Sequence, residues 1–280
     1  MSAIAVRAAR LRSGLVLPYA EAGRPEGAPV VFVHGLADSW WAFEPLLRQL
    51  PAPLRGYALT QRGHGDAQRP EDGYDPQDFA GDLVEFLDAV GIRRAVLVGA
   101  SSGGVAARLV AGSHPDRVAG LVLAGVPATL ADKPAALALA AKVKDLADPV
   151  PRAFVEELLA GLTARPPGRG LLATIAEENL KVPARVWRAT LRGLLETDLA
   201  ATLKGILVPA LVLWGDADGL LPRSDQQRML DTLFDARLVV YEGAGHALYW
   251  EQPERLGQDV AAFAAEVLPD RPDGRAAPRG

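Results

Sequence analysis

The chain has 280 residues, of which 49% are apolar and 23% charged, and its formal net charge is -4. This length and composition fit one elaborated α/β domain with a large core, and the even spread of charges argues against a nucleic acid partner. With no cysteine and only four histidines, the chain offers neither a disulfide framework nor a thiolate metal site, so we expect no metal and no cofactor.

We expect no signal peptide and no membrane-spanning segment in this sequence. The opening MSAIAVRAARLRSG has no apolar core of signal-peptide length, and no apolar run in the sequence is long enough to span a bilayer. We therefore expect a cytoplasmic protein without a membrane span. Residues 269–280 have few apolar side chains and are expected to form a flexible tail. The sequence leaves the oligomeric state open.

Short apolar runs alternate with helical patterns along the chain. This alternation predicts an α/β fold, with a mostly parallel central sheet and helices on both faces. The predicted strands are residues 30–33, 55–60, 95–99, 118–125, 206–214 and 237–241, and the clearest helices are residues 76–90 and 253–267. Residues 1–127 and 205–268 are expected to form this core.

A long helical segment separates two of the predicted strands. Residues 128–204 carry no strand signal and are too long for a simple crossover. Prolines mark expected helix starts and a break within the segment: Pro134, Pro151 and Pro183, and Pro166 with Pro167. We predict a cap of three or four helices over the carboxyl edge of the sheet, where sites in such sheets gather.

The run AVLVGASSGG, residues 95–104, ends a predicted strand in a cluster of small residues. Residues 99–103 fit the G-x-S-x-G nucleophile elbow, in which Ser101 sits on a strained turn between a strand and a helix. The backbone N–H of Ser102 would then lie at the first turn of the helix, where it can stabilise an oxyanion.

A serine nucleophile needs a histidine that takes its proton and a carboxylate that orients the histidine. The strand over 206–214 is followed by Asp216 and Asp218, and the strand over 237–241 by a small-residue loop that contains His246. The order Ser, Asp, His is expected for acyl transfer on an open α/β sheet. The loop after the strand over 30–33 offers the N–H of Leu36 as a second oxyanion donor.

Over nearly its whole length the chain resembles the α/β-hydrolase superfamily, in the capped branch of esterase-like and haloperoxidase-like enzymes. Five segments carry the resemblance: VFVHGLADSWWAF (31–43), QRGHGDAQRP (61–70), VLVGASSGG (96–104), LVLWGDADGLLP (211–222) and GAGHALYWEQPE (243–254). The resemblance implies Ser101 as the nucleophile, His246 as the base and Asp218 rather than Asp216 as the acid. It also implies that Leu36 and Ser102 form the oxyanion hole.

Two features depart from the pattern of the family. Thr60 stands where an acid is common two residues before Arg62, so the salt link that usually braces this loop is expected to be altered. The elbow also allows a second frame over residues 100–104 with Ser102 as the nucleophile. We prefer Ser101 because the strand ends at Gly99 and paired glycines normally follow the nucleophile by two positions.

Other residues are candidates for supporting or binding roles. Trp40, which follows the oxyanion loop, and Trp187, within the cap segment, fit either a substrate pocket or the core. Leu220 lies in the loop of the predicted acid and is a third candidate for substrate binding. Among the remaining histidines, we expect His34 to brace the oxyanion loop and His64 to bond its own turn.

This set of residues predicts a serine hydrolase that cleaves a carboxylic ester or lactone of a small to medium hydrophobic substrate through an acyl-enzyme. Haloalkane dehalogenases and epoxide hydrolases are disfavoured, because both need a carboxylate at the elbow. Three alternatives remain: a perhydrolase or cofactor-free haloperoxidase, a carbon-carbon bond hydrolase with the same triad, and a ligand-binding receptor on the same fold.

Overall fold

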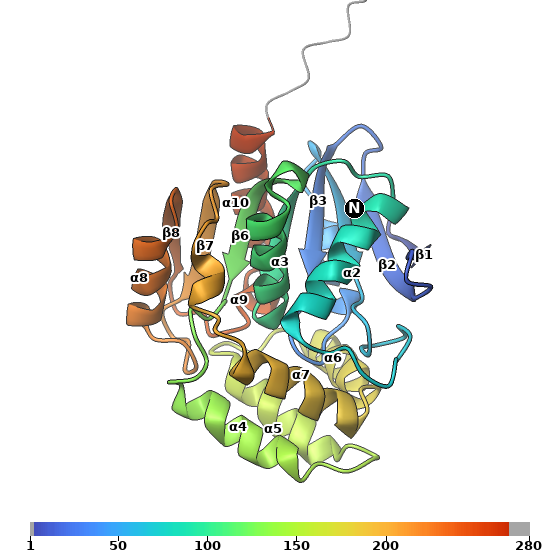
Figure 1. The fold of residues 1–280 in the computed structure, drawn as a ribbon, viewed down its shortest axis with the longest axis vertical. Coiled ribbons are helices and arrows are strands. Elements are labelled where there is room, and N and C mark those ends of the chain that lie inside the picture. The colour runs from blue at the N-terminus through green and yellow to red at the C-terminus, as the bar shows by residue number, and fades with distance from the viewer. Residues whose placement is uncertain (1–2, 269–280) are drawn as a thin grey trace, which may run out of the picture.

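One eight-stranded sheet forms the centre of the protein, with the strand order β1-β2-β4-β3-β5-β6-β7-β8 (Figure 1). The computed structural model describes residues 3–268, so the predicted tail over 269–280 lies outside the described residues. β1 pairs with β2 and β2 with β4 in antiparallel fashion, and every later pairing is parallel. The predicted mostly parallel sheet is confirmed. The strands are β1 (Ala5–Arg10), β2 (Val16–Gly23), β3 (Ala28–Val33), β4 (Leu54–Leu59), β5 (Ala95–Ala100), β6 (Val118–Ala124), β7 (Ala210–Gly215) and β8 (Ala236–Tyr241).

Helices cover both faces of the sheet because the side chains of its central strands alternate between two apolar layers. In β3, Val30 and Phe32 belong to one buried cluster, and Val31 and Val33 belong to the other. Helices α1 and α10 pack on the first face, and α2, α3 and α8 on the second. The helices outside the insertion are α1 (Glu44–Arg48), α2 (Pro76–Ala89), α3 (Ser102–Ser113), α8 (Arg223–Thr232), α9 (Leu248–Glu251) and α10 (Pro253–Val267).

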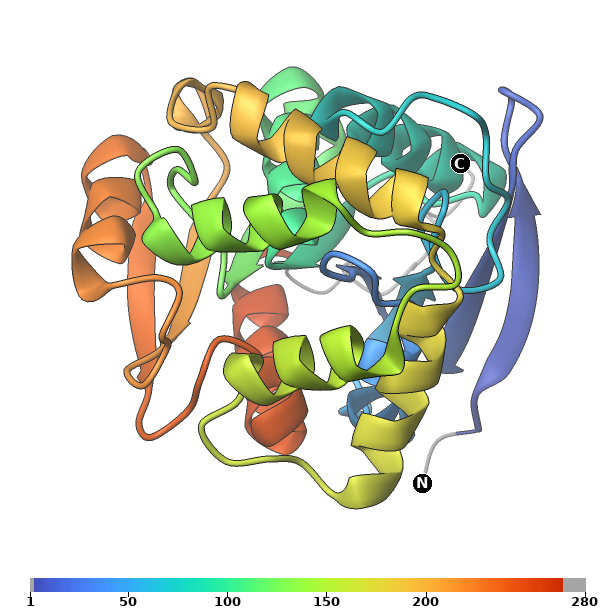
Figure 2. The ribbon, with the colours of Figure 1, turned by 90° about the horizontal axis from the view of Figure 1, so that it is seen from below.

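Four helices inserted between β6 and β7 lie over one end of the sheet, as Figure 2 shows from below. Pro134 is the first residue of α4, and Pro151 and Pro183 are the N-cap residues of α5 and α7. The predicted helical insertion is therefore confirmed. Its division from the core at residues 128 and 204 stays a prediction. The inserted helices are α4 (Pro134–Lys144), α5 (Arg152–Leu162), α6 (Arg169–Leu180) and α7 (Ala184–Glu196).

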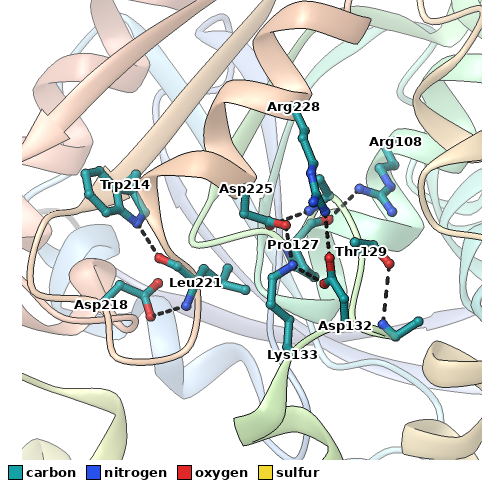
Figure 3. A network of polar contacts seen from close by, with 12 residues as sticks. Arg108, Pro127, Thr129, Asp132, Lys133, Trp214, Asp218, Leu221, Asp225 and Arg228 are labelled. Carbon is teal, nitrogen blue, oxygen red and sulfur yellow. Dashed lines mark hydrogen bonds and ion pairs between the residues drawn. The ribbon is translucent and has the colours of Figure 1, made fainter.

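A buried polar network holds the base of the insertion (Figure 3). Arg108 of α3 donates hydrogen bonds to the carbonyl of Pro127 at 2.7 Å, before the insertion, and to the carbonyl of Leu199 at 2.9 Å, after it. Beside them, the ammonium of Lys133 lies 2.6 Å from the carboxylate of Asp225 at the start of α8. Both ends of the insertion are thus fixed to the helix that follows the elbow.

The structure differs from the predicted elements in several places. The β1–β2 hairpin, helix α8 and the short helices α1 and α9 were not predicted, and the strand predicted over 206–214 begins only at Ala210. Pro209, which precedes this strand, has no N–H to donate to a neighbouring strand. Within residues 3–268, no helix combines the length and the apolar character needed to cross a membrane.

Candidate active site

Ser101 lies between the end of β5 and the start of α3, at the carboxyl edge of the sheet. Its φ of 48° and ψ of -122° are unusual for a residue with a side chain, and such strain clusters at functional sites. The turn needs glycines on both sides. A Cβ on Gly103 would lie 2.3 Å from the carbonyl oxygen of His34, and one on Gly99 would lie 2.3 Å from the Cα of Gly104. The tight turn therefore holds Ser101 at the tip of the elbow.

The loop after β8 brings His246 to the serine. The Nε2 atom of His246 lies 3.0 Å from Ser101 Oγ, and its Nδ1 atom lies 2.9 Å from Asp218 Oδ2. The side chains of His246 and Asp218 are 5% and 0% exposed, so bulk water does not compete for these contacts. With the Nδ1 proton donated to Asp218, Nε2 can accept the serine proton.

Asp218 is fixed by its own loop. Its Oδ1 atom accepts hydrogen bonds from the N–H groups of Leu220 at 2.8 Å and Leu221 at 3.0 Å, which leaves Oδ2 for His246. Asp216 has a different place in the same loop: its Oδ1 accepts from the N–H of Gly243 at 2.6 Å. The structure thus brings Asp218, and not Asp216, to the histidine.

Two backbone N–H groups are available near Ser101. Ser102 is the first residue of α3, where an N–H has no partner within the helix. Leu36 lies in the loop after β3, next to Gly35, and a Cβ built on Gly35 would be 3.3 Å from Ser101 Cβ. Within residues 3–268, neither N–H donates a hydrogen bond to another protein group. Both can therefore bind an oxyanion.

His34 braces the loop that carries Leu36. Burial lowers the pKa of His34 well below its usual value, so the ring is neutral. A neutral ring can accept the N–H of Gln61 at Nε2, 3.0 Å away, while Nδ1–H donates to the carbonyl of Gly35 at 2.8 Å. His64 lies 5.2 Å from the His34 ring, and its Nδ1 pairs with the carbonyl of Arg62 at 2.7 Å.

The altered salt link near Thr60 has a different geometry from the one common in the family. Arg62 forms a two-pronged pair with Asp82 of α2, with both contacts at 2.6 Å. The hydroxyl of Thr60 instead accepts the N–H of Trp40 at 3.2 Å. The loop is therefore braced from α2 rather than from its own strand.

A cavity of about 390 Å³ opens in front of Ser101 and His246. Helices α4 and α5 of the insertion supply much of its apolar wall, through Leu139, Phe154, Leu158 and Leu162. The core contributes Leu36 and Leu220 and two polar side chains, Asp38 and Tyr249. Cavities of this size and lining bind small organic molecules.

Of the three predicted substrate-binding residues, the structure brings only Leu220 to the cavity wall. Trp40 is 8% exposed and stacks on Trp41 with ring centroids 4.2 Å apart. Trp187 is fully buried and meets the edge of Phe154 at 5.4 Å. Both tryptophans therefore lie in the core and not on the cavity wall. Trp187 packs against Phe154, which does line the cavity.

Asp38 and Tyr249 were not singled out from the sequence. A signal was present, because Asp38 follows the oxyanion loop by two residues and Tyr249 follows His246 by three. Both residue types are also common in turns and in cores. Position in the sequence alone therefore does not distinguish a residue that lines the cavity from a structural one. Within residues 3–268, no group of three or more His, Cys, Asp or Glu side chains could hold a metal ion.

Comparison with known proteins agrees with the fold. A family model described as alpha/beta hydrolase fold matches residues 28–253, and the chain belongs to this family. Non-heme chloroperoxidase from Streptomyces lividans is 31% identical over 88% of this chain and 94% of the relative. Epoxide hydrolase A from Mycobacterium tuberculosis is 31% identical over 90% of this chain and 94% of the relative. The crystal structure of an esterase from Rhodococcus superposes with a TM-score of 0.81 at 28% identity, over 94% of this chain and 99% of that chain.

Proposed function

We propose that this α/β-hydrolase cleaves a carboxylic ester or lactone of a small to medium hydrophobic substrate. Ser101 is the nucleophile, His246 the general base and acid, and Asp218 the carboxylate that orients His246. The N–H groups of Leu36 and Ser102 form the oxyanion hole. The observation that carries the proposal is the unbroken chain of contacts from Asp218 through His246 to Ser101, at 2.9 and 3.0 Å.

The reaction follows from these contacts. His246 Nε2 takes the proton of Ser101 as the oxygen attacks the carbonyl carbon, and the two N–H groups hold the negative charge that develops on the carbonyl oxygen. His246 then gives this proton to the leaving alcohol, and an acyl-serine remains. Water, deprotonated by His246, attacks the acyl-serine and releases the acid. The apolar wall of the cavity supports a largely hydrophobic substrate.

The similarity to an epoxide hydrolase does not redirect this proposal. In that family's pattern a carboxylate at the elbow attacks the epoxide carbon, and this chain has Ser101 at the elbow. The pattern also uses a cap tyrosine to polarise the epoxide oxygen, and residues 128–204 contain none. A serine favours attack on a carbonyl carbon, because the acyl-serine that forms is readily hydrolysed.

The test uses p-nitrophenyl butanoate and a fluorophosphonate probe that labels active-site serines. The wild-type protein is expected to hydrolyse the ester and to react once with the probe, whereas Ser101→Ala should do neither. Ser102→Ala is the matched control, because it removes the neighbouring hydroxyl and keeps the backbone N–H. Labelling of Ser101→Ala but not of Ser102→Ala would move the nucleophile to Ser102. Equal ester turnover in wild type and Ser101→Ala would refute the proposal.

A second candidate is perhydrolase or haloperoxidase chemistry at the same site, favoured by the similarity to the chloroperoxidase from Streptomyces lividans. Hydrogen peroxide would replace water in the attack on the acyl-serine and would release a peracid, which oxidises halide outside the enzyme. Monochlorodimedone bromination in acetate with peroxide measures this reaction. A rate in that assay that exceeds ester hydrolysis, and that is lost in Ser101→Ala, would favour the second candidate.

A further inference from the structure

Asp38 places a buried carboxyl group in the cavity wall. The residue is only 3% exposed, and it lies two positions after Leu36 in the loop that carries the proposed oxyanion donor. Its Oδ1 atom accepts a long hydrogen bond of 3.4 Å from Asn179 Nδ2 on helix α6. The hydroxyl of Tyr249, on α9, interacts with the same carboxyl, and the two groups affect each other's pKa. Asp38 therefore joins the oxyanion loop, the insertion and the helix after His246.

The surroundings of this carboxyl favour its neutral form. Burial raises the pKa of Asp38 well above its usual value, although the contacts with Asn179 and Tyr249 lower it in part; the nearby carboxylate of Glu178 adds a smaller rise. Burial likewise raises the pKa of Tyr249, and the charge of Asp218 acts in the same direction. Lys142 also lies on the cavity wall, but its ammonium pairs with the carboxylate of Glu157 at 2.8 Å. The side chains of both residues are more than half exposed. Both shifts favour the forms in which the Asp38 carboxyl and the Tyr249 hydroxyl carry hydrogen.

Two adjacent O–H groups contain two donor hydrogens. One hydrogen can be accepted by the oxygen of the neighbouring group, so the pair retains one donor that can point into the cavity. A buried donor that has no acceptor is unfavourable. An oxygen atom of a ligand would supply the missing acceptor. The pair also lies close to the nucleophile. A Cβ built on Gly35 would be 3.3 Å from Ser101 Cβ and 3.6 Å from the Tyr249 hydroxyl.

We propose that Asp38 and Tyr249 form a polar subsite that donates a hydrogen bond to a second oxygen of the substrate, in the acyl group and within a few bonds of the scissile carbonyl. The preferred substrates are then esters of oxygenated acids, such as 3-hydroxy acids, rather than plain alkanoates. This inference rests on the proposed ester hydrolysis. The acyl side is assigned because Asp38 belongs to the loop of Leu36, whose N–H is proposed to hold the carbonyl oxygen of the acyl group.

The experiment compares p-nitrophenyl 3-hydroxybutanoate with p-nitrophenyl butanoate, two esters that share a leaving group and differ by one hydroxyl. We expect a ratio of their kcat/KM values of about ten or more in the wild type, because a site built to bond a substrate oxygen discriminates against the analogue without it. Asp38→Leu should lower this ratio at least about tenfold, whereas Asp38→Asn, which keeps a donor, should retain most of it.

Two further variants keep the test decisive. Tyr249→Phe removes only the other hydroxyl and should also lower the ratio, which covers the case in which Asp38→Leu does not fold. Asp66→Asn is the matched control, because Asp66 is an exposed carboxylate paired with Lys181 outside the cavity, and its ratio should equal that of the wild type. A wild-type ratio near one, or a ratio unchanged in both Asp38→Leu and Tyr249→Phe, would overturn the subsite.

Binding to Ser101→Ala separates the subsite from the proposed function, because it needs no turnover. Calorimetry with the two esters should show about tenfold tighter binding of the 3-hydroxy ester. If the wild type hydrolyses neither ester but Ser101→Ala still prefers the 3-hydroxy ester, the proposed hydrolysis fails and the subsite stands. If both esters are hydrolysed at equal rates and bind equally, the subsite fails and the hydrolase proposal stands.

Discussion

Lys133 and Asp225 form a buried ion pair, 2.6 Å long, between the residue before α4 and the first turn of α8. Their side chains are 7% and 0% exposed. Asp225 Oδ2 also accepts the N–H of Ala128 at 2.8 Å, so a single carboxylate joins the beginning of the insertion to the core. Removing Lys133 from this buried pair is costly, because the carboxylate of Asp225 then loses its ion-pair partner.

We therefore predict that Lys133→Met lowers the free energy of unfolding by about 3 kcal/mol, the usual cost of a charge left alone in the interior. The double variant with Asp225→Asn should recover part of this loss, because the amide leaves no charge. Urea unfolding monitored by circular dichroism measures both. The pair would be shown to contribute little if the two single losses added without coupling in the double variant.

The acid of the site can be tested in isolation from its neighbour. Asp218→Asn should lower kcat for p-nitrophenyl butanoate by about 10³- to 10⁴-fold, because the amide no longer favours the histidine tautomer that accepts the serine proton. KM should change little, since Asp218 is turned toward His246 and its own loop. Asp216→Asn, which affects only the contact with Gly243, should cost less than about tenfold. A larger loss from Asp216→Asn than from Asp218→Asn would reverse the assignment.

Two glycines of α3 should respond to alanine in opposite ways. At Gly103 the added Cβ would meet the carbonyl oxygens of His34 and Val33 at 2.3 and 2.4 Å, so Gly103→Ala should displace the elbow and lower both stability and activity. Gly112, near the end of the same helix, is exposed and has room for a Cβ. Gly112→Ala should raise stability by about 0.5–1 kcal/mol, the usual gain in a helix. Melting temperatures and ester turnover of the two variants check this contrast.

Acid should destabilise the protein through its buried histidines. Burial lowers the pKa of His64 from 6.5 to about 4 and lowers that of His34 well below 6.5, so the unfolded chain binds protons that the folded chain does not. Stability is then lost as pH falls from about 6.5 toward 4, by about 1.4 kcal/mol per pH unit for each histidine. Asp38 and Asp82, whose pKa values are raised by burial, act in the opposite direction.

A variant isolates the histidine contribution. Between pH 7 and pH 5, the free energy of unfolding of the wild type should fall by about 2 kcal/mol more than that of His64→Gln, which cannot titrate. Urea unfolding at the two pH values measures the difference, and the aspartates cancel because both proteins contain them. Parallel losses in the two proteins would mean that His64 is protonated in the folded state.

The parts of the site that were predictable from the sequence depend on short segments. The elbow at Ser101 and the loops of Asp218 and His246 each follow a strongly apolar strand, so their shared edge of the sheet follows from the parallel order of the strands. The pairing of Asp38 with Tyr249 was not predictable in this way. It joins a loop and a helix more than two hundred positions apart, and neither residue is part of a periodic pattern.

Two of the missed elements, β1 and α8, lack a local hydrophobic signal. In β1, only Ala9 is buried, because this edge strand is held by pairing with β2 rather than by an apolar face. Helix α8 has the sequence RSDQQRMLDT, and the buried side chains in it are Asp225, Gln226 and Met229. Tertiary contacts with the sheet and with Lys133 position this helix, and these are not visible in its own residues.

Arg108 binds two backbone carbonyls, one on each side of the inserted helices. The guanidinium of Arg108 binds the chain just before and just after the four inserted helices. Both ends of the insertion are therefore fixed to α3, the helix that directly follows Ser101. We expect that another insertion grafted between these anchor points would change the wall of the cavity while the proposed triad keeps its position.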